Sequence, residues 1–221
     1  MNDETQDTLR VPVMPVTHTV LLPGAVVPLV LFEENDLALV DEVCRSQELA
    51  LGVVYSPRRE MDTGLSTGDI GTLGRIIQHK RSPKGEVSLM VQGTRRMRVA
   101  SLLQQEPFAV AEVSMLEDDE PEDPRRLRER VLEVFQDFLD HCQGDVAGLK
   151  ANLDAIQPLG GVVDVALACV PLDTDARQKL LETLDTGRRA EGFIALLEHH
   201  LRKIGLKRNK RFDPGHGFSL N

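Results

Sequence analysis

The spacing around Ser66 is the first candidate for chemistry in this sequence. Residues 64–68 read Gly-Leu-Ser-Thr-Gly, which matches GxSxG, the nucleophile elbow of many hydrolases. That elbow requires a sharp turn from a buried strand into a helix, which exposes the serine oxygen. Here a polar stretch, 57–62, precedes the motif and a strand-like pattern, 69–77, follows it. We therefore interpret the motif as a glycine-rich loop and expect no catalytic residue there.

The histidines and cysteines are poorly spaced for a metal site or an activated nucleophile. His199 and His200 are adjacent on an expected helix and point about 100° apart, unlike an i, i+4 chelating pair. Cys142 follows His141 but falls on an apolar stripe, which is typical of a buried small side chain. The HExxH motif of zinc proteases and the CxxC motif are absent from the sequence. The sequence also has no Gly-Lys pair, which a phosphate-binding P-loop requires. We expect no enzyme activity, no metal and no cofactor; a hydrolase with a cryptic site is an alternative.

Composition narrows the classes of partner. The chain has 35 acidic and 26 basic residues and a formal net charge of −9, so a broad nucleic-acid-binding surface is not expected. Its three cysteines are far apart, which predicts reduced thiols rather than a disulfide framework. The longest mainly apolar run, 20–32, is interrupted by two prolines and a glycine and is too short to cross a bilayer. We expect a cytoplasmic protein with no membrane partner.

An acidic stretch divides the chain into two parts with different periodicity. Residues 117–124 carry six carboxylates and two prolines, which predicts a solvated linker. Residues 1–116 alternate with period two in several short runs, which predicts a β-rich domain with one early helix, capped by Asn35. Residues 125–205 repeat apolar side chains every 3.6 residues, which predicts a helical bundle. Residues 206–221 are expected to form a flexible basic tail.

Turn and capping residues predict where elements begin and end. Lys84-Gly85 lies between two strand-like runs, at the place where a hairpin needs a turn. In the second part, Asp173 or Thr174 is expected to cap one helix and Thr186 the last one. Gly205 is expected to close that last helix.

The apolar run 20–32 is unusual, because its prolines and glycine argue against a regular central strand. Such a segment is either core between two β pairings or an exposed rim that accepts apolar peptides. Under the rim interpretation, the candidate protein-binding residues are Val26, Val27, Leu29, Leu31 and Phe32. Val27 and Leu31 are the members that we expect to be exposed.

Eight short segments carry a series of motifs that can be compared with known families. They are 11–16, 22–24, 27–29 and 32–33, then 69–76, 91–99, 170–173 and 179–185. The chain therefore resembles the Lon N-terminal, substrate-binding domain family over most of its length, from Leu9 to Ile204. The resemblance implies an α+β fold: a PUA-like β pseudobarrel with one early helix, followed by an α-helical bundle.

The resemblance also implies a function. A stand-alone member without the ATPase and peptidase domains would be a non-catalytic protein- or peptide-binding module. It would act as an adaptor or weak holdase for unfolded or degron-bearing proteins, with a protease in trans as a further partner. RNA binding is the alternative, since PUA-like barrels elsewhere bind RNA and Arg95, Arg96 and Arg98 form a local basic cluster. Against it, residues 1–116 carry 11 basic and 15 acidic side chains, and the chain has no tryptophan.

Overall fold

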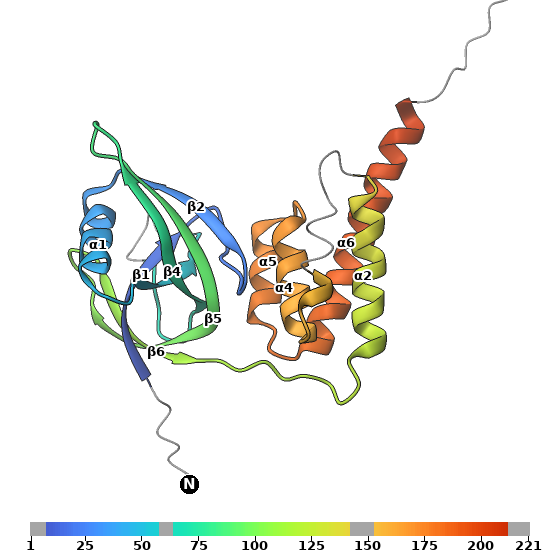
Figure 1. Cartoon of the computed structure of the whole chain (residues 1–221), viewed down its shortest axis with the longest axis horizontal. Helices are drawn as coiled ribbons and strands as arrows, with labels where there is room; N and C mark the ends of the chain where they lie inside the picture. The colour runs from blue at the N-terminus through green and yellow to red at the C-terminus, as the bar shows by residue number, and fades with distance from the viewer. Residues whose placement is uncertain (1–7, 58–63, 142–152, 212–221) are drawn as a thin grey trace, which may run out of the picture.

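The computed structural model describes residues 8–57, 64–141 and 153–211. It has two parts lying side by side, a β-barrel and a helical bundle (Figure 1). The barrel contains β1 (Thr8–Val16), β2 (Val26–Leu31), α1 (Glu34–Arg45), β3 (Ala50–Tyr55), β4 (Ile70–Arg81), β5 (Val87–Gln104) and β6 (Ala109–Met115). The bundle contains α2 (Arg125–Leu139), α4 (Leu159–Cys169), α5 (Thr174–Glu182) and α6 (Thr186–Arg211). The expected α+β fold is confirmed.

One six-stranded sheet, in the order β2-β5-β4-β3-β1-β6, closes into the barrel through a further pairing of β5 with β6. All pairings are antiparallel except β1 with β3. One edge of the long strand β5 pairs with β4, and its other edge is shared. Residues 87–92 of that edge pair with β2, and residues 97–104 pair with β6. The strand β2 is therefore an extension of the barrel wall beyond the closed ring.

The expected elements of the barrel are present, with differences at their ends. Gly85, in the turn between β4 and β5, has a φ of 91°, which glycine adopts without strain. The early helix α1 places Leu39, Val40 and Val43 in the barrel core. Its N-cap is Glu33, whose backbone is extended, so the expectation that Asn35 caps this helix was wrong.

The bundle buries one apolar face of each helix, as the 3.6-residue period predicts. Phe135 of α2 and Phe193 of α6 lie in its core. Asp173 is the N-cap of α5, as expected, and its carboxylate accepts hydrogen bonds from two backbone amides. For α6 the accepting side chain is Asp185 rather than Thr186.

The last helix, α6, does not end at Gly205 but continues to Arg211. A single glycine weakens a helix by only about 1 kcal/mol, which is too little to end one this long. The first six residues of the expected flexible tail are therefore helical.

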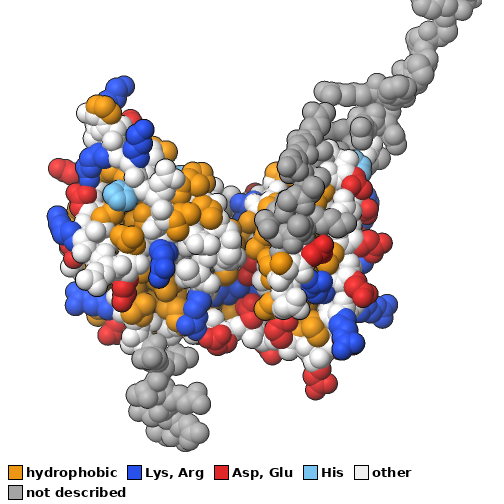
Figure 2. Space-filling model, in the orientation of Figure 1, with side chains coloured by type: hydrophobic (Ala, Val, Ile, Leu, Met, Phe, Trp, Pro, Cys, Tyr) orange, Lys and Arg blue, Asp and Glu red, His pale blue; other side chains and the backbone are white. Residues whose placement is uncertain are grey.

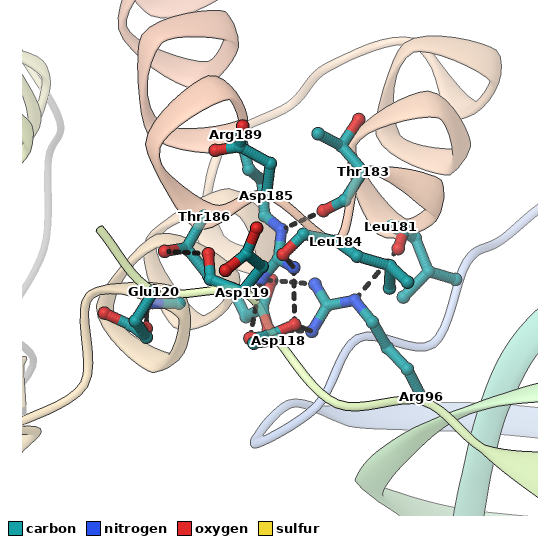
Figure 3. Close-up of polar contacts among 12 residues, drawn as sticks. Arg96, Asp118, Asp119, Glu120, Leu181, Thr183, Leu184, Asp185, Thr186 and Arg189 are labelled. Atoms are coloured by element: carbon teal, nitrogen blue, oxygen red, sulfur yellow. Dashed lines mark hydrogen bonds and ion pairs between the residues drawn. The ribbon is translucent and has the colours of Figure 1, made fainter. Parts of the chain in front are cut away.

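The acidic stretch 117–124 is not simply solvated. Its Asp118 carboxylate accepts two hydrogen bonds from Arg189, at 2.6 and 3.0 Å. The Asp119 backbone exchanges hydrogen bonds with Leu184 and Thr186, and Glu120 accepts from the first amides of α4 (Figure 3). The expectation of a solvated linker was wrong for Asp118, which is partly buried, whereas Asp119 and Glu120 are exposed and also form hydrogen bonds with the bundle. The run is thus held by partners that lie 39 to 71 residues away in sequence.

Candidate peptide-binding surface

The strand β2 is an edge strand. It pairs with β5 on one side, and no other strand of the described chain pairs with its second side. The Gly93 amide donates to the Ala25 carbonyl, so the Ala25 C=O group faces β5. Because antiparallel pairs alternate, the backbone groups of Val26, Pro28 and Val30 point away from β5. Pro28 thus lies where its missing N–H removes no hydrogen bond from the sheet.

The five sequence-predicted binding residues do not share one environment. Val26 is 41% exposed and Phe32 is 73% exposed, whereas Val27 is half-buried. Leu29 and Leu31 are buried in the barrel core. The prediction that these two leucines form part of an exposed rim was wrong, because a strand directs alternate side chains to opposite faces.

A further exposed residue, Val30, was missed by the sequence analysis. It is 60% exposed and lies between the two buried leucines of β2. The signal was available: once Val26–Leu31 is taken as an edge strand, period-two alternation places Val26, Pro28 and Val30 on one outer face. The prolines argue against a regular central strand but not against an edge strand, which tolerates them, and the sequence analysis did not consider that possibility.

Two neighbouring strands extend this apolar surface. Met90 of β5 lies opposite Pro28 and is half-buried. Ile77 of β4 occupies a β-bulge and is 51% exposed. We call the set Val26, Pro28, Val30, Phe32, Ile77 and Met90 the β2 surface. Hydrophobic side chains gather on this part of the barrel, with Lys and Arg side chains on the same face (Figure 2).

The strands β4 and β5, which lie next to β2, are basic although the chain as a whole is acidic. Residues 70–104 contain seven Lys or Arg and one acidic residue, Glu86. Three of the seven arginines and lysines are paired: Arg81 with Asp41, Arg95 with Glu117, and Arg96 with Asp164 of the bundle. The other four are exposed and form no ion pair with a described residue: Arg75, Lys80, Lys84 and Arg98.

The loop before β2 is fixed between barrel and bundle, and this sets the position of the strand. Val20, Leu22 and Ala25 belong to the core of the helical bundle. Gly24 has a φ of 78°, and a Cβ there would lie 3.1 Å from Val165 of α4. At Gly93 a Cβ would overlap the carbonyl oxygen of Leu22. The β2 surface therefore begins at a tightly packed junction.

Buried ion pairs join barrel and bundle beside this loop (Figure 3). Arg96 leaves β5 and donates two hydrogen bonds to Asp164 of α4, at 2.6 and 2.8 Å, and one to the Leu181 carbonyl. Arg189 of α6 binds Asp118 and lies 3.5 Å from Asp164. Burial raises the pKa of Asp164, and the Arg96 guanidinium opposes that effect.

Each charged side chain in this cluster pairs with a side chain of opposite charge. We therefore interpret the cluster as a structural joint between barrel and bundle. Arg96, which the sequence analysis considered for RNA binding, is 4% exposed and unavailable to a ligand. Asp164 was overlooked. A single carboxylate inside an apolar helix must find a partner, and that was the available signal.

The candidates for catalysis and metal binding are not assembled into a site. Ser66 is exposed in a turn that leads into β4 rather than into a helix, and its amide donates to the Asp69 carboxylate. His199 is exposed and His200 lies against Phe138. Cys142 lies outside the described residues. Among the described residues no group of three His, Cys, Asp or Glu could hold a metal ion.

The two described cysteines are not activated. Burial raises the pKa of the Cys169 thiol. Burial, together with the nearby charge of Asp41, also raises the pKa of Cys44. A raised pKa keeps both thiols protonated near neutral pH, which makes them poor nucleophiles.

The sequence matches the family model of the ATP-dependent protease La (LON) substrate-binding domain over residues 10–199. The chain belongs to this family. The Lon protease of Desulfosudis oleivorans is 28% identical over 202 residues, which are 89% of this chain and 24% of that protein. Lon protease 2 of Myxococcus xanthus is 28% identical over 191 residues, 84% of this chain and 23% of that protein. The chain thus spans about a quarter of the length of these relatives.

Solved Lon domains share this fold. The N-terminal domain of Mycobacterium avium complex Lon protease superposes with a TM-score of 0.66 at 24% identity, covering 87% of this chain and all of that one. The Lon N-terminal domain protein from Xanthomonas campestris gives a TM-score of 0.60 at 26% identity, covering 85% of this chain and 98% of that one. In the part of this Lon domain that is described, no helix is both long and apolar enough to span a membrane.

Proposed function

We propose that this Lon substrate-binding domain is a non-catalytic recognition module that binds unfolded or degron-bearing polypeptide segments on the β2 surface. Its role would be that of an adaptor or a weak holdase. The observation that carries the proposal is the exposed apolar row of Val26, Pro28 and Val30 on an edge strand, with Phe32 73% exposed beside it. Contiguous apolar groups on a protein surface commonly mark an interaction site.

The composition of the β2 surface suits weak binding of many sequences. Burying a valine or phenylalanine side chain contributes about 1.5–3 kcal/mol. Two or three such contacts, less the free energy needed to order a flexible segment, leave a Kd that is roughly micromolar or weaker. Hydrophobic contacts are not directional, so the surface would select for apolar character more than for one sequence.

Two further parts of the proposal concern partner and location. The relatives named Lon protease contain the matching segment within chains about four times as long. This supports a protease as a second partner of the domain. We place the domain in the cytoplasm, in keeping with two described cysteines that form no disulfide.

The test uses Phe32→Ser and Val30→Ser in a binding assay with a permanently unfolded protein. Reduced, alkylated α-lactalbumin carrying a fluorescent label would report binding through anisotropy. Each substitution should weaken binding about tenfold, the loss of roughly one apolar contact. Both side chains are largely exposed, so the thermal midpoint should change little.

The matched control is Leu103→Ser, an equally drastic change at an exposed apolar residue of a different strand, β5. Leu103 is 47% exposed and lies in the half of β5 that pairs with β6, away from β2. Its substitution should leave binding unchanged. If all three variants bind like the parent protein, or if Leu103→Ser is the one that weakens binding, the β2 surface is not the binding site.

RNA binding is the second candidate, supported by the excess of basic residues over 70–104. Burial of Arg96 and the ion pair between Arg95 and Glu117 reduce the basic area that RNA could contact. A labelled single-stranded RNA in the same anisotropy assay would distinguish the two. Binding to RNA, lost on Lys80→Ala or Arg75→Ala but not on Phe32→Ser, would favour this candidate.

A further inference from the structure

We propose that the bound segment adds to β2 as an extra strand of the barrel sheet, and that the preferred segment is extended, apolar in its centre and acidic at its flanks. This inference rests on the function proposed above and concerns how the β2 surface recognises its ligand. It has two parts, a backbone part and a charge part, and each is carried by a different feature of the strand.

The backbone part follows from the hydrogen-bonding pattern of β2. The N–H groups of Val26 and Val30, and the C=O groups of Val26, Pro28 and Val30, point away from β5. No described strand pairs with them. An added strand would lie about 4.8 Å away and meet these groups over six residues. Strand addition to an exposed sheet edge is a general mode of peptide recognition, in which the main chain supplies affinity with little dependence on sequence.

Pro28 explains how such an edge avoids indiscriminate pairing. A free edge is a hazard because another copy of the chain can add to it, and proline is one of the residues that limit this. Pro28 removes the central donor of the edge and leaves one donor on each side of it. A ligand strand can therefore form hydrogen bonds at both ends of β2 but receives none in the middle. This weakens pairing without abolishing it.

The side chains on the outer face favour an apolar centre. Alternate residues of an added strand would lie beside Val26, Pro28 and Val30, with Met90 and Ile77 on the strands beyond. The side chains of β5 between these strands are uncharged, because Val26 lies opposite Gln92 and Val30 opposite Ser88.

The charge part follows from the outer face of β4. Arg75 lies opposite Gln92, and Lys80 lies opposite Ser88, so each follows the same cross-strand row as one end of β2. An added strand would lie about 14 Å from β4, three strand spacings away. Side chains reaching from both strands would bring opposite charges to within the Debye length of about 8 Å at physiological salt. Neither Arg75 nor Lys80 has an ion-pair partner among the described residues.

The test uses short labelled peptides and the unaltered protein. Each peptide has five central residues that alternate valine and threonine, with two flanking residues at each end that are either acidic or lysine. The acidic-flanked peptide should bind about tenfold more tightly at about 50 mM salt, and the difference should shrink at about 500 mM. Equal binding of the two peptides at low salt, or tighter binding of the lysine-flanked one, would overturn the charge part.

N-methylation of the acidic-flanked peptide tests the backbone part without changing the protein. Methyl groups on alternate amides remove the donors on one edge of the peptide strand only. A peptide pairing through one edge should lose binding about tenfold in one N-methylated frame and retain it in the other. If both frames bind like the parent peptide, or both lose binding equally, strand addition is wrong.

A protein variant provides a second measurement. Val30→Pro removes an N–H donor that faces the open edge. It should leave the pairing of β2 with β5 intact, because Pro28, two residues earlier, also lacks an outward N–H and is tolerated there. Val30→Ala keeps that donor and shortens the side chain. If Val30→Pro loses more peptide binding than Val30→Ala, strand addition is supported. If both variants lose the same amount of binding, strand addition is contradicted. If no peptide binds but unfolded α-lactalbumin still does, the inference fails alone; if neither binds, the proposed function fails too.

Discussion

Replacing Arg96 with methionine should strongly destabilise the protein, because it removes one partner from a buried ion pair. Methionine keeps the unbranched apolar stem of the side chain and removes only the guanidinium group. Asp164, which is 1% exposed, would lose both of its hydrogen bonds from Arg96. Its nearest remaining cation would be Arg189, at 3.5 Å.

The expected magnitude follows from the burial of the pair. Removing one partner of a buried ion pair leaves an uncompensated charge and costs about 3–5 kcal/mol. Because Arg189 remains close to Asp164, we expect a loss near the lower end, about 3 kcal/mol. The double variant Arg96→Met, Asp164→Leu removes both charges and leaves Arg189 paired with Asp118. It should therefore be more stable than the single variant.

Urea unfolding followed by far-ultraviolet circular dichroism measures these free energies. The matched control is Arg81→Met, which removes an arginine whose ion pair with Asp41 is about half exposed. Pairs of that kind contribute about 0–1 kcal/mol. If Arg96→Met costs no more than Arg81→Met, or if the double variant is less stable than Arg96→Met, the description of the joint as a buried, mutually dependent ion pair is wrong.

Two more predictions concern the contacts between barrel and bundle. The Tyr55 hydroxyl donates a hydrogen bond to the Asp175 carboxylate at 2.7 Å, and this bond raises the pKa of Tyr55. The bond should therefore stabilise the fold below the ordinary tyrosine pKa of about 10. That stabilisation should be lost as the pH rises through the higher pKa of Tyr55 in the folded state. Tyr55→Phe should therefore be less stable than the parent at pH 7 but equal to it at strongly alkaline pH in urea unfolding, and a difference that persists there would contradict the assignment. Gly93→Ala should lower stability by about 1–3 kcal/mol, because the new Cβ would overlap the Leu22 carbonyl; an unchanged thermal midpoint would show that the junction is loosely packed.

Local sequence patterns were sufficient to predict the two halves of the fold. Alternation in β6 and the turn at Gly85 predicted strands, and the apolar stripe of α2 predicted a helix. These signals depend on neighbouring residues, so they are readable without knowledge of the tertiary structure. The errors at Asn35 and Gly205 concern helix ends, where a cap or a single glycine competes with the surrounding packing.

Contacts between distant residues could not be predicted in the same way. Asp118 was expected in solvent because its neighbours in sequence are acidic, yet it pairs with Arg189. Arg96 was expected on a basic surface. Its place on the outer face of β5 is consistent with strand alternation, but the helical bundle covers that face. A run of like charges in the sequence indicates repulsion between neighbouring side chains. It does not indicate which distant residues the fold brings close enough to form ion pairs with them.

The exposure of the candidate binding residues in segment 26–32 was predicted only in part. Val26 and Phe32 are exposed, whereas Leu29 and Leu31 are core residues. Choosing between them required the register of β2 against β5, because a shift of one residue exchanges the two faces of a strand.

Hydrogen–deuterium exchange with and without unfolded α-lactalbumin tests the central claim, that polypeptides bind at the β2 surface, most directly. The amides of Val26 and Val30 face the open edge and should exchange rapidly in the unbound domain. Ligand should slow exchange in peptides covering residues 26–33, while peptides covering β1 and β6 stay unchanged. Protection restricted to the bundle or to β6, with no change across residues 26–33, would contradict the account.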